Sequence, residues 1–356
     1  MRTAVGLILC ASLLGCGWVY RNSKVMDVLV LPPRVEVATH AARSDDGVSL
    51  ALHRHANSKP PRDAAVLLCH SMGFNSGVWE AGAKPGLAAF LAVEGYDVWR
   101  LDFRGCGMSG PASPQTTLDD YALRDIPAAL ALVTKTTNRR KIFVIGHGAG
   151  GTAALIHALS AREPMPAGLV LIGSPLTAPQ PRDAILRDLS AARLHLADPL
   201  MRYPSIIPNL SPPPPKGWES LFINPANIEP DTRDRLFRQC SEPIPDGALD
   251  QFMQMLETGR LKSRNSERTY LDECGVIRLP LLAICGKGDN FAPPETVRAT
   301  YHKASSMGKK FRLFCRANGD GADFGNMDLI CGKNVDAIVY PEIERWLREQ
   351  TNGKTE

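Results

Sequence analysis

The segment IFVIGHGAGG, residues 142–151, decides the fold. Its first four residues are apolar, with the β-branched and aromatic side chains typical of a short buried strand. Four of the next six residues are glycines, and an alanine-rich apolar stretch follows them. This pattern predicts a strand over 141–145, a sharp turn centred on Gly148 and a helix over 150–161.

The same alternation of short apolar strands with helices extends in both directions from this segment. Apolar runs predict further strands at 49–54, 64–69, 96–101, 168–172, 279–285 and 311–315. Helices are expected over 85–94, 118–134, 295–303 and 335–348. The alternation predicts an α/β fold in which a mostly parallel central sheet carries helices on both faces.

One long interval interrupts this alternation. Residues 175–277 show no strand signal, contain a run of prolines at 212–215 and have a helical pattern at 248–256. We therefore expect an inserted helical cap over 175–277, between a first part of the core at 40–174 and a second part at 278–350.

The N-terminus has the pattern of an export signal. Arg2 precedes an apolar stretch over 4–14, which is too short to span a membrane comfortably. The sequence Leu-Leu-Gly-Cys that ends at Cys16 resembles a bacterial lipoprotein cleavage site, which would make Cys16 the lipidated first residue of the mature chain. A plain signal peptide, a signal anchor or no export are the alternatives. We expect a signal or anchor over 1–18, a linker over 19–39, and an exported or membrane-anchored protein of the cell envelope.

Composition and charge narrow the classes of partner. The chain has 356 residues, of which 44% are hydrophobic, and its net charge of +4 arises from 41 basic and 37 acidic residues with no block of one sign. Nucleic acid is therefore not an expected partner. The nine cysteines include no CxxC pair, so Cys69 and Cys285 are expected to be buried free thiols, and neither a metal site nor a cofactor is expected.

Three segments together resemble the α/β-hydrolase superfamily, in particular its bacterial lysophospholipase-like and polyhydroxyalkanoate-synthase-like branch. VLLCHSMG at 66–73 is similar to the loop whose backbone N–H groups line the oxyanion hole. DFRGCGMS at 102–109 is similar to the loop after the next strand, and 142–151 is similar to the nucleophile elbow. The resemblance covers nearly all of the chain from about residue 40 onward.

The resemblance implies that the nucleophile is missing. The central residue of the elbow carries the attacking Oγ in these enzymes, and here that residue is Gly148, which has no side chain. The N–H groups of Met72 and Ala149 are the expected oxyanion donors. His70, Ser71 and His147 complete the set of residues expected around this binding site.

The acid of the triad is present and the base is not. LLAICGKGD ends at Asp289, the position of the acid, although this carboxylate has an alternative role in capping the turn before Pro293. FGNMDL at 324–329 is similar to a Tyr-Gly-His-x-Asp-Leu stretch, with Asn326 where the base histidine belongs. His302 is the only histidine after Asp289, and it falls in a predicted helix, the wrong element for the base.

These substitutions predict an inactive pseudo-hydrolase that binds a lipid, an acyl or ester-like ligand, or a protein partner. Loss of one such residue lowers turnover by a factor on the order of 10⁶, and a second loss adds little. The alternative is an active esterase, lipase or acyltransferase with a displaced nucleophile, for which Ser71 is the candidate. No base is identifiable beside Ser71, and its side chain is expected to bond the local backbone. His157 is expected to be an ordinary packed histidine and Cys106 a residue of a tight turn.

Overall fold

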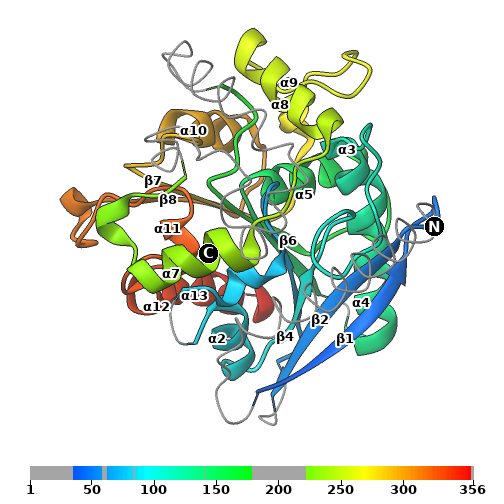
Figure 1. Cartoon of the computed structure of the whole chain (residues 1–356). Coiled ribbons are helices and arrows are strands. Elements are labelled where there is room, and N and C mark those ends of the chain that lie inside the picture. The colour runs from blue at the N-terminus through cyan, green and yellow to red at the C-terminus, as the bar shows by residue number, and fades with distance from the viewer. Residues whose placement is uncertain (1–34, 58–61, 83–84, 140, 179–221, 354–356) are drawn as a thin grey trace, which may run out of the picture.

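The computed structural model describes residues 35–57, 62–82, 85–139, 141–178 and 222–353 (Figure 1). The predicted signal over 1–18, with Cys16, and the first part of the predicted linker lie outside these residues. The described chain forms one sheet of eight strands in the order β1-β2-β4-β3-β5-β6-β7-β8. The strands are β1 (Val35–Arg43), β2 (Ser49–Asn57), β3 (Ala65–Cys69), β4 (Asp97–Leu101), β5 (Ile142–His147), β6 (Gly168–Ile172), β7 (Leu281–Gly286) and β8 (Lys309–Phe314).

The sheet is parallel from β4 to β8 and antiparallel where β1 and β2 join it. Every residue of β3, β4, β5, β6 and β7 is buried, which explains why β3, β5, β6 and β7 are mainly apolar rather than alternating. Strand β4 (DVWRL) differs, because it also buries Asp97 and Arg100. The prediction of a mostly parallel sheet is confirmed.

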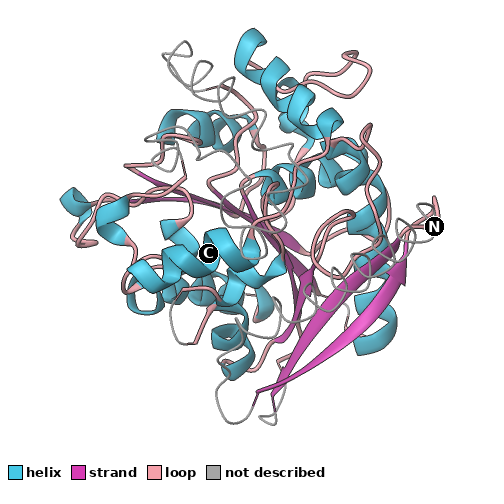
Figure 2. Cartoon of the chain, viewed as in Figure 1, coloured by secondary structure: helices cyan, strands magenta, loops and turns pink. Residues whose placement is uncertain are grey.

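Helices cover both faces of the sheet (Figure 2). Leu67 and Val144 point to the face packed by α4 (Ile126–Thr137), α5 (Ala149–Ser160) and α10 (Pro294–Lys303). Val66 and Ile145 point to the opposite face. That face is packed by α2 (Leu87–Val93), α11 (Asp328–Cys331), α12 (Val335–Ile338) and α13 (Tyr340–Thr351). Each central strand therefore contributes side chains to two hydrophobic layers, one on each face of the sheet.

The region predicted to be a cap contains helices and no named strand in its described part, residues 175–178 and 222–277. These elements are η5 (Pro225–Asn227), α7 (Pro230–Arg235), η6 (Leu236–Cys240), α8 (Asp246–Thr258), α9 (Tyr270–Glu273) and η7 (Cys274–Val276). The inner face of α8 joins the core through Leu249, Phe252 and Leu256. The boundaries of the cap stay a prediction, because residues 179–221 lie outside the described chain.

The structure corrects the predicted linker. Strand β1 begins at Val35, so residues 35–39 belong to the sheet and not to a linker over 19–39. The cause is tertiary pairing: all nine residues of β1 pair with β2 across a turn in which Gly47 has φ +87°. The alternation of buried and exposed residues along β1 is weak, which is why the sequence pattern did not show it.

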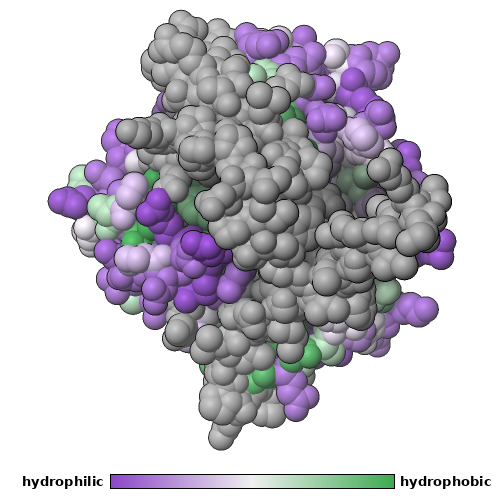
Figure 3. Space-filling view, in the orientation of Figure 1, coloured by the Kyte–Doolittle hydropathy of each residue, from purple (hydrophilic) through white to green (hydrophobic). Residues whose placement is uncertain are grey.

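The described surface is mostly hydrophilic on the face shown in Figure 3. The large hydrophobic side chains that are exposed among the described residues are Met108, Val276 and Met307. Within the described ranges, no helix is long and apolar enough to cross a membrane.

Candidate functional site

The turn between β5 and α5 has the geometry of an elbow. Gly148 links the two elements with φ 52° and ψ −123°, a conformation that L side chains rarely adopt. A Cβ on Gly150 would lie 2.3 Å from the carbonyl oxygens of Cys69 and His70. The missing side chain at Gly150 therefore allows α5 to pack directly against the end of β3.

The side chain of Ser71 occupies the space beside Gly148. A Cβ built on Gly148 would lie 2.4 Å from Ser71 Oγ, closer than any real non-bonded contact. The N–H of Ala149 donates to the same oxygen over 3.2 Å. The expectation that Ser71 bonds its local backbone is thus wrong, since its partner lies 78 positions away in sequence. One of the two N–H groups predicted to be oxyanion donors is engaged within the protein.

Asp289, the predicted acid of the triad, both caps the turn that follows it and contacts the residue at the base position. Asp289 Oδ1 accepts hydrogen bonds from the N–H groups of Phe291, at 2.9 Å, and Ala292, at 2.7 Å, and so caps the turn. Asp289 Oδ2 accepts from Asn326 Nδ2 over 2.8 Å. Burial raises the pKa of Asp289 to about 7, although these donors oppose the shift.

The loop that carries Asn326 is held in place by a second carboxylate. Asp328 accepts from the N–H of Gly325 at 3.0 Å and from the N–H of Asn224 at 2.9 Å.

The side chain of Asn326 lies close to the elbow. Its Nδ2 also contacts the carbonyl oxygen of Gly173 at 3.3 Å. Asn326 is 2% exposed, and its Oδ1 lies 4.0 Å from the Cβ position of Gly148. The structure thus brings together the three positions that the sequence assigned to a triad.

Two buried histidines tie the loops of the site to one another. His70 Nε2 accepts from the N–H of Phe103 at 3.1 Å, so its Nδ1 is the protonated nitrogen that donates to Ser71 O at 2.8 Å. His147 Nε2 donates to the carbonyl oxygen of Asn326 at 3.1 Å. Burial lowers the pKa of His70, and it lowers the pKa of His147 to about 4. Both imidazoles are therefore neutral at pH 7 and hold backbone groups.

A hydroxyl–imidazole–carboxylate chain lies elsewhere, and no sequence motif pointed to it. Asp102 Oδ2 contacts His53 Nε2 at 3.1 Å, and His53 Nδ1 contacts Thr39 Oγ1 at 2.9 Å. Asp102 also accepts from the N–H groups of Ser76 and Met108, each at 2.9 Å. Burial acts to raise the pKa of Asp102, but the hydrogen bond from His53 and neighbouring groups hold it below the usual range. Thr39 and His53 meet because they are opposite each other in the β1–β2 register, which requires knowledge of the pairing.

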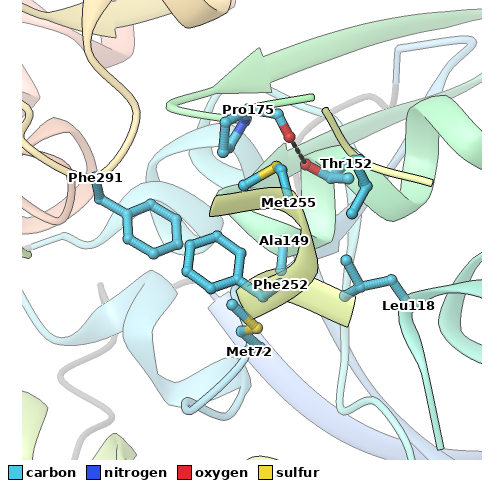
Figure 4. A pocket seen from close by; sticks show the side chains of 9 residues that line it. Met72, Leu118, Ala149, Thr152, Pro175, Phe252, Met255 and Phe291 are labelled. Atoms are coloured by element: carbon cyan, nitrogen blue, oxygen red, sulfur yellow. Dashed lines mark hydrogen bonds between the residues drawn. The ribbon is translucent and has the colours of Figure 1, made fainter. Parts of the chain in front are cut away.

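A small apolar pocket borders the elbow on the side of α8 (Figure 4). It is lined by Met72, Leu118, Ala149, Thr152, Pro175, Phe252, Met255, Leu261 and Phe291. The rings of Phe252 and Phe291 stack with centroids 4.9 Å apart and an interplanar angle of 10°, and Figure 4 shows the two rings side by side. The free interior is about 10 Å³, which is room for roughly one water molecule.

The remaining expected residues have structural surroundings. His157 is fully buried and donates to the carbonyl oxygen of Pro164 at 3.0 Å. Cys69 and Cys285 are buried free thiols, Cys106 is buried in the turn after β4, and burial raises the pKa of Cys285 to about 12. No group of three histidine, cysteine, aspartate or glutamate side chains within the described part of the chain is arranged to hold a metal ion.

Comparisons with known proteins agree with this fold. The family model described as serine aminopeptidase, S33, matches residues 60–317, a range that includes the elbow and Asp289 and stops before Asn326. Human lipase member K is 32% identical over 126 residues, which are 31% of this chain and 32% of the lipase. The tear acid lipase-like protein of Mesocricetus auratus is 31% identical over 133 residues, 33% of each chain. This chain therefore matches about a third of the length of these curated relatives.

Solved structures show the same fold at low sequence identity. An esterase from Thermogutta terrifontis superposes with a TM-score of 0.59 at 18% identity, covering 89% of this chain and 99% of the esterase. A membrane phospholipase A described as a bacterial virulence factor superposes with a TM-score of 0.58 at 16% identity, covering 99% of both chains.

Proposed function

The chain belongs to the serine aminopeptidase S33 family of α/β-hydrolases, and we propose that it is a non-catalytic member that binds an acyl or lipid chain without hydrolysing it. The observation that carries this proposal is the pair of residues at the elbow and at the base position. Gly148 offers no oxygen to attack a carbonyl, and Asn326 offers no nitrogen that accepts a proton at neutral pH.

The contacts of Asn326 support the loss of the base. Its Nδ2 donates to Asp289, so its Oδ1 is the atom directed toward the elbow. An amide oxygen accepts a hydrogen bond but is too weakly basic to take a proton from a hydroxyl group at pH 7. Asp289 thus orients an amide in the place where a hydrolase orients an imidazole.

The pocket supports an apolar ligand. Its lining is almost wholly hydrocarbon and includes two methionines, whose flexible thioethers adapt to chains of different shape. Its small free volume requires the Phe252–Phe291 stack to separate before a chain enters. The names of the relatives, lipases and a phospholipase, favour a lipid as the ligand class.

We also propose that the protein acts at the cell envelope, held there through its N-terminus. The predicted export signal and the resemblance of the Cys16 motif to a lipoprotein cleavage site support this location. At the cell envelope the alternative ligand is a protein partner. Its binding would not require the rings of Phe252 and Phe291 to separate.

Ester turnover and chain binding test the proposed function. Purified full-length protein is assayed with p-nitrophenyl acetate and p-nitrophenyl decanoate, and titrated with a fluorescent fatty acid. The proposal expects no turnover above a heat-denatured sample, together with saturable binding of the fatty acid. Turnover that Asp289→Ala abolishes would overturn it, and absence of fatty-acid binding would leave the protein partner as the function.

One observation favours an active enzyme as the second candidate. Thr39 is an exposed hydroxyl bonded to His53, which in turn contacts the buried Asp102, so this hydroxyl has the basic partner that Ser71 lacks among the described residues. A fluorophosphonate probe with mass-spectrometric mapping separates the candidates. Labelling of Thr39 or Ser71 that Thr39→Val or Ser71→Ala removes would establish a displaced nucleophile. An unlabelled protein supports the non-catalytic reading.

A further inference from the structure

We infer that Ser71 is a third determinant of the inactive state, which fills the place of the lost nucleophile and blocks the oxyanion hole. The inference rests on the proposed function, and it names what a ligand of this site meets. A ligand carbonyl oxygen finds the Ala149 N–H already bonded to a serine hydroxyl, so the site accepts the hydrocarbon part of an acyl chain and not its ester group.

The distances from Ser71 to position 148 and to the Ala149 N–H show how Ser71 obstructs the site. The Cβ of any residue at position 148 would lie 2.4 Å from Ser71 Oγ and 3.0 Å from Ser71 Cβ. Both atoms therefore lie within the volume of a side chain at 148. The N–H of Ala149, at 3.2 Å from Ser71 Oγ, is the donor that follows the nucleophile position in this fold.

The backbone around Ser71 is fixed, so the hydroxyl can leave the space beside position 148 only by rotation of its side chain. His70 donates to the carbonyl oxygen of Ser71 and accepts from the N–H of Phe103, linking the loop to the end of β4. Ser71 is 6% exposed, and a Cβ on the following Gly73 would lie only 3.3 Å from Ile244. Rotation of Ser71 Oγ away from Ala149 would leave that buried N–H without its partner, which is unfavourable.

It follows that restoring only the two triad residues does not restore the site. A serine at 148 would overlap with Ser71, and the oxyanion donor would stay engaged. The substitution Ser71→Gly removes the obstructing atoms and frees the Ala149 N–H at once. Three substitutions, Ser71→Gly, Gly148→Ser and Asn326→His, are therefore needed to rebuild an acyl-transfer site.

A double-mutant cycle measured by thermal unfolding tests the overlap without any need for activity. Gly148→Ser is introduced into the wild type and into Ser71→Gly, and the fall in Tm is compared. The strain of a side chain at φ 52° is common to both backgrounds and cancels. We expect a fall of several degrees in the wild type and a clearly smaller fall with Ser71→Gly. Equal falls would overturn the inference.

The control for the cycle replaces an exposed serine. Ser305 follows α10 and is exposed, so Ser305→Gly is expected to leave the cost of Gly148→Ser unchanged. If Gly148→Ser lowers Tm less in Ser305→Gly than in the wild type, the effect is not specific to Ser71, and this result would also overturn the inference.

Ester hydrolysis supplies the second readout. Turnover of p-nitrophenyl acetate is compared between the Gly148→Ser, Asn326→His variant and the same variant with Ser71→Gly. We expect the third substitution to raise kcat by about 10² or more, the usual effect of one oxyanion donor. Equal and measurable activity of the two variants would refute the role of Ser71 and leave the proposed function standing. Activity of the wild type would refute the proposed function itself, and if both variants are inactive the thermal cycle decides.

Discussion

At the scale of single residues, the site depends on a carboxyl group that burial makes difficult to ionise. Asp289 is 2% exposed, and its environment raises its pKa to about 7, while in the unfolded chain its pKa is near the ordinary value of 3.8. The folded state therefore binds a proton more tightly than the unfolded state does. Between about pH 4 and pH 7 this group lowers the free energy of unfolding as pH rises.

This linkage predicts how Asp289→Asn behaves. Asparagine keeps an oxygen that can accept from Phe291 and Ala292 but removes the titrating group. We expect the difference in Tm, variant minus wild type, to be more positive at pH 8 than at pH 4.5. At pH 8 the folded wild type must bury an ionised carboxylate, which destabilises it, whereas the variant has no group to ionise. Thermal unfolding at both pH values measures this difference, and a relative Tm independent of pH would contradict the shifted pKa.

At the scale of secondary-structure elements, the junction of β3 with α5 depends on a glycine. A Cβ on Gly150 would lie 2.3 Å from two backbone carbonyl oxygens, and backbone cannot yield as a flexible side chain can. We expect Gly150→Ala to cost about 3 kcal/mol or more of unfolding free energy. Gly275→Ala is the matched control, because a Cβ there would meet nothing within 4 Å, and it is expected to change stability by less than about 0.5 kcal/mol. Similar denaturation midpoints for the two variants would refute the close approach.

Phe252 of α8 lines the pocket beside the elbow and packs in the core. Phe252 is 4% exposed and stacks on Phe291, so Phe252→Ala is expected to cost about 3–5 kcal/mol and to leave an apolar cavity beside the elbow. An acyl chain can then occupy that space without separating the two rings, so the affinity for a fluorescent fatty acid should rise about tenfold. Glu257→Ala, at an exposed position of the same helix, should leave affinity unchanged. Weaker binding by Phe252→Ala would show that the chain does not enter here.

At the scale of the whole molecule, the sequence predicted the sheet because its central strands are buried on both faces and most of them are largely apolar in sequence. It did not predict β1, whose weak pattern becomes a strand only through its pairing with β2. It also predicted one helix over 335–348, where the structure has α12 and then α13, with Pro341 in the first turn of the second helix.

The residues of the site also differ in how far the sequence predicts them. Resemblance to family motifs pointed to Gly148, Asp289 and Asn326, because each lies in a short stretch whose residue pattern is itself similar to the family's. The position of Ser71 Oγ depends on how two loops approach each other across the sheet, and no spacing along the chain contains that distance. The partners of Thr39 and His53 likewise depend on strand register.

The attachment of the molecule to a membrane is the last expectation, and it concerns chain outside the described residues. Cys16 and Val35 lie 19 positions apart, and a chain of that length spans at most about 65 Å. A lipid on Cys16 would therefore hold the hydrolase fold close to the membrane surface, where lipid ligands are concentrated. In a Gram-negative host, we expect the wild type to incorporate labelled palmitate and to fractionate with membranes, and Cys16→Ser to do neither. Cys10→Ser, in the same apolar segment, should behave as the wild type. Membrane fractionation of Cys16→Ser without labelling would instead establish a signal anchor.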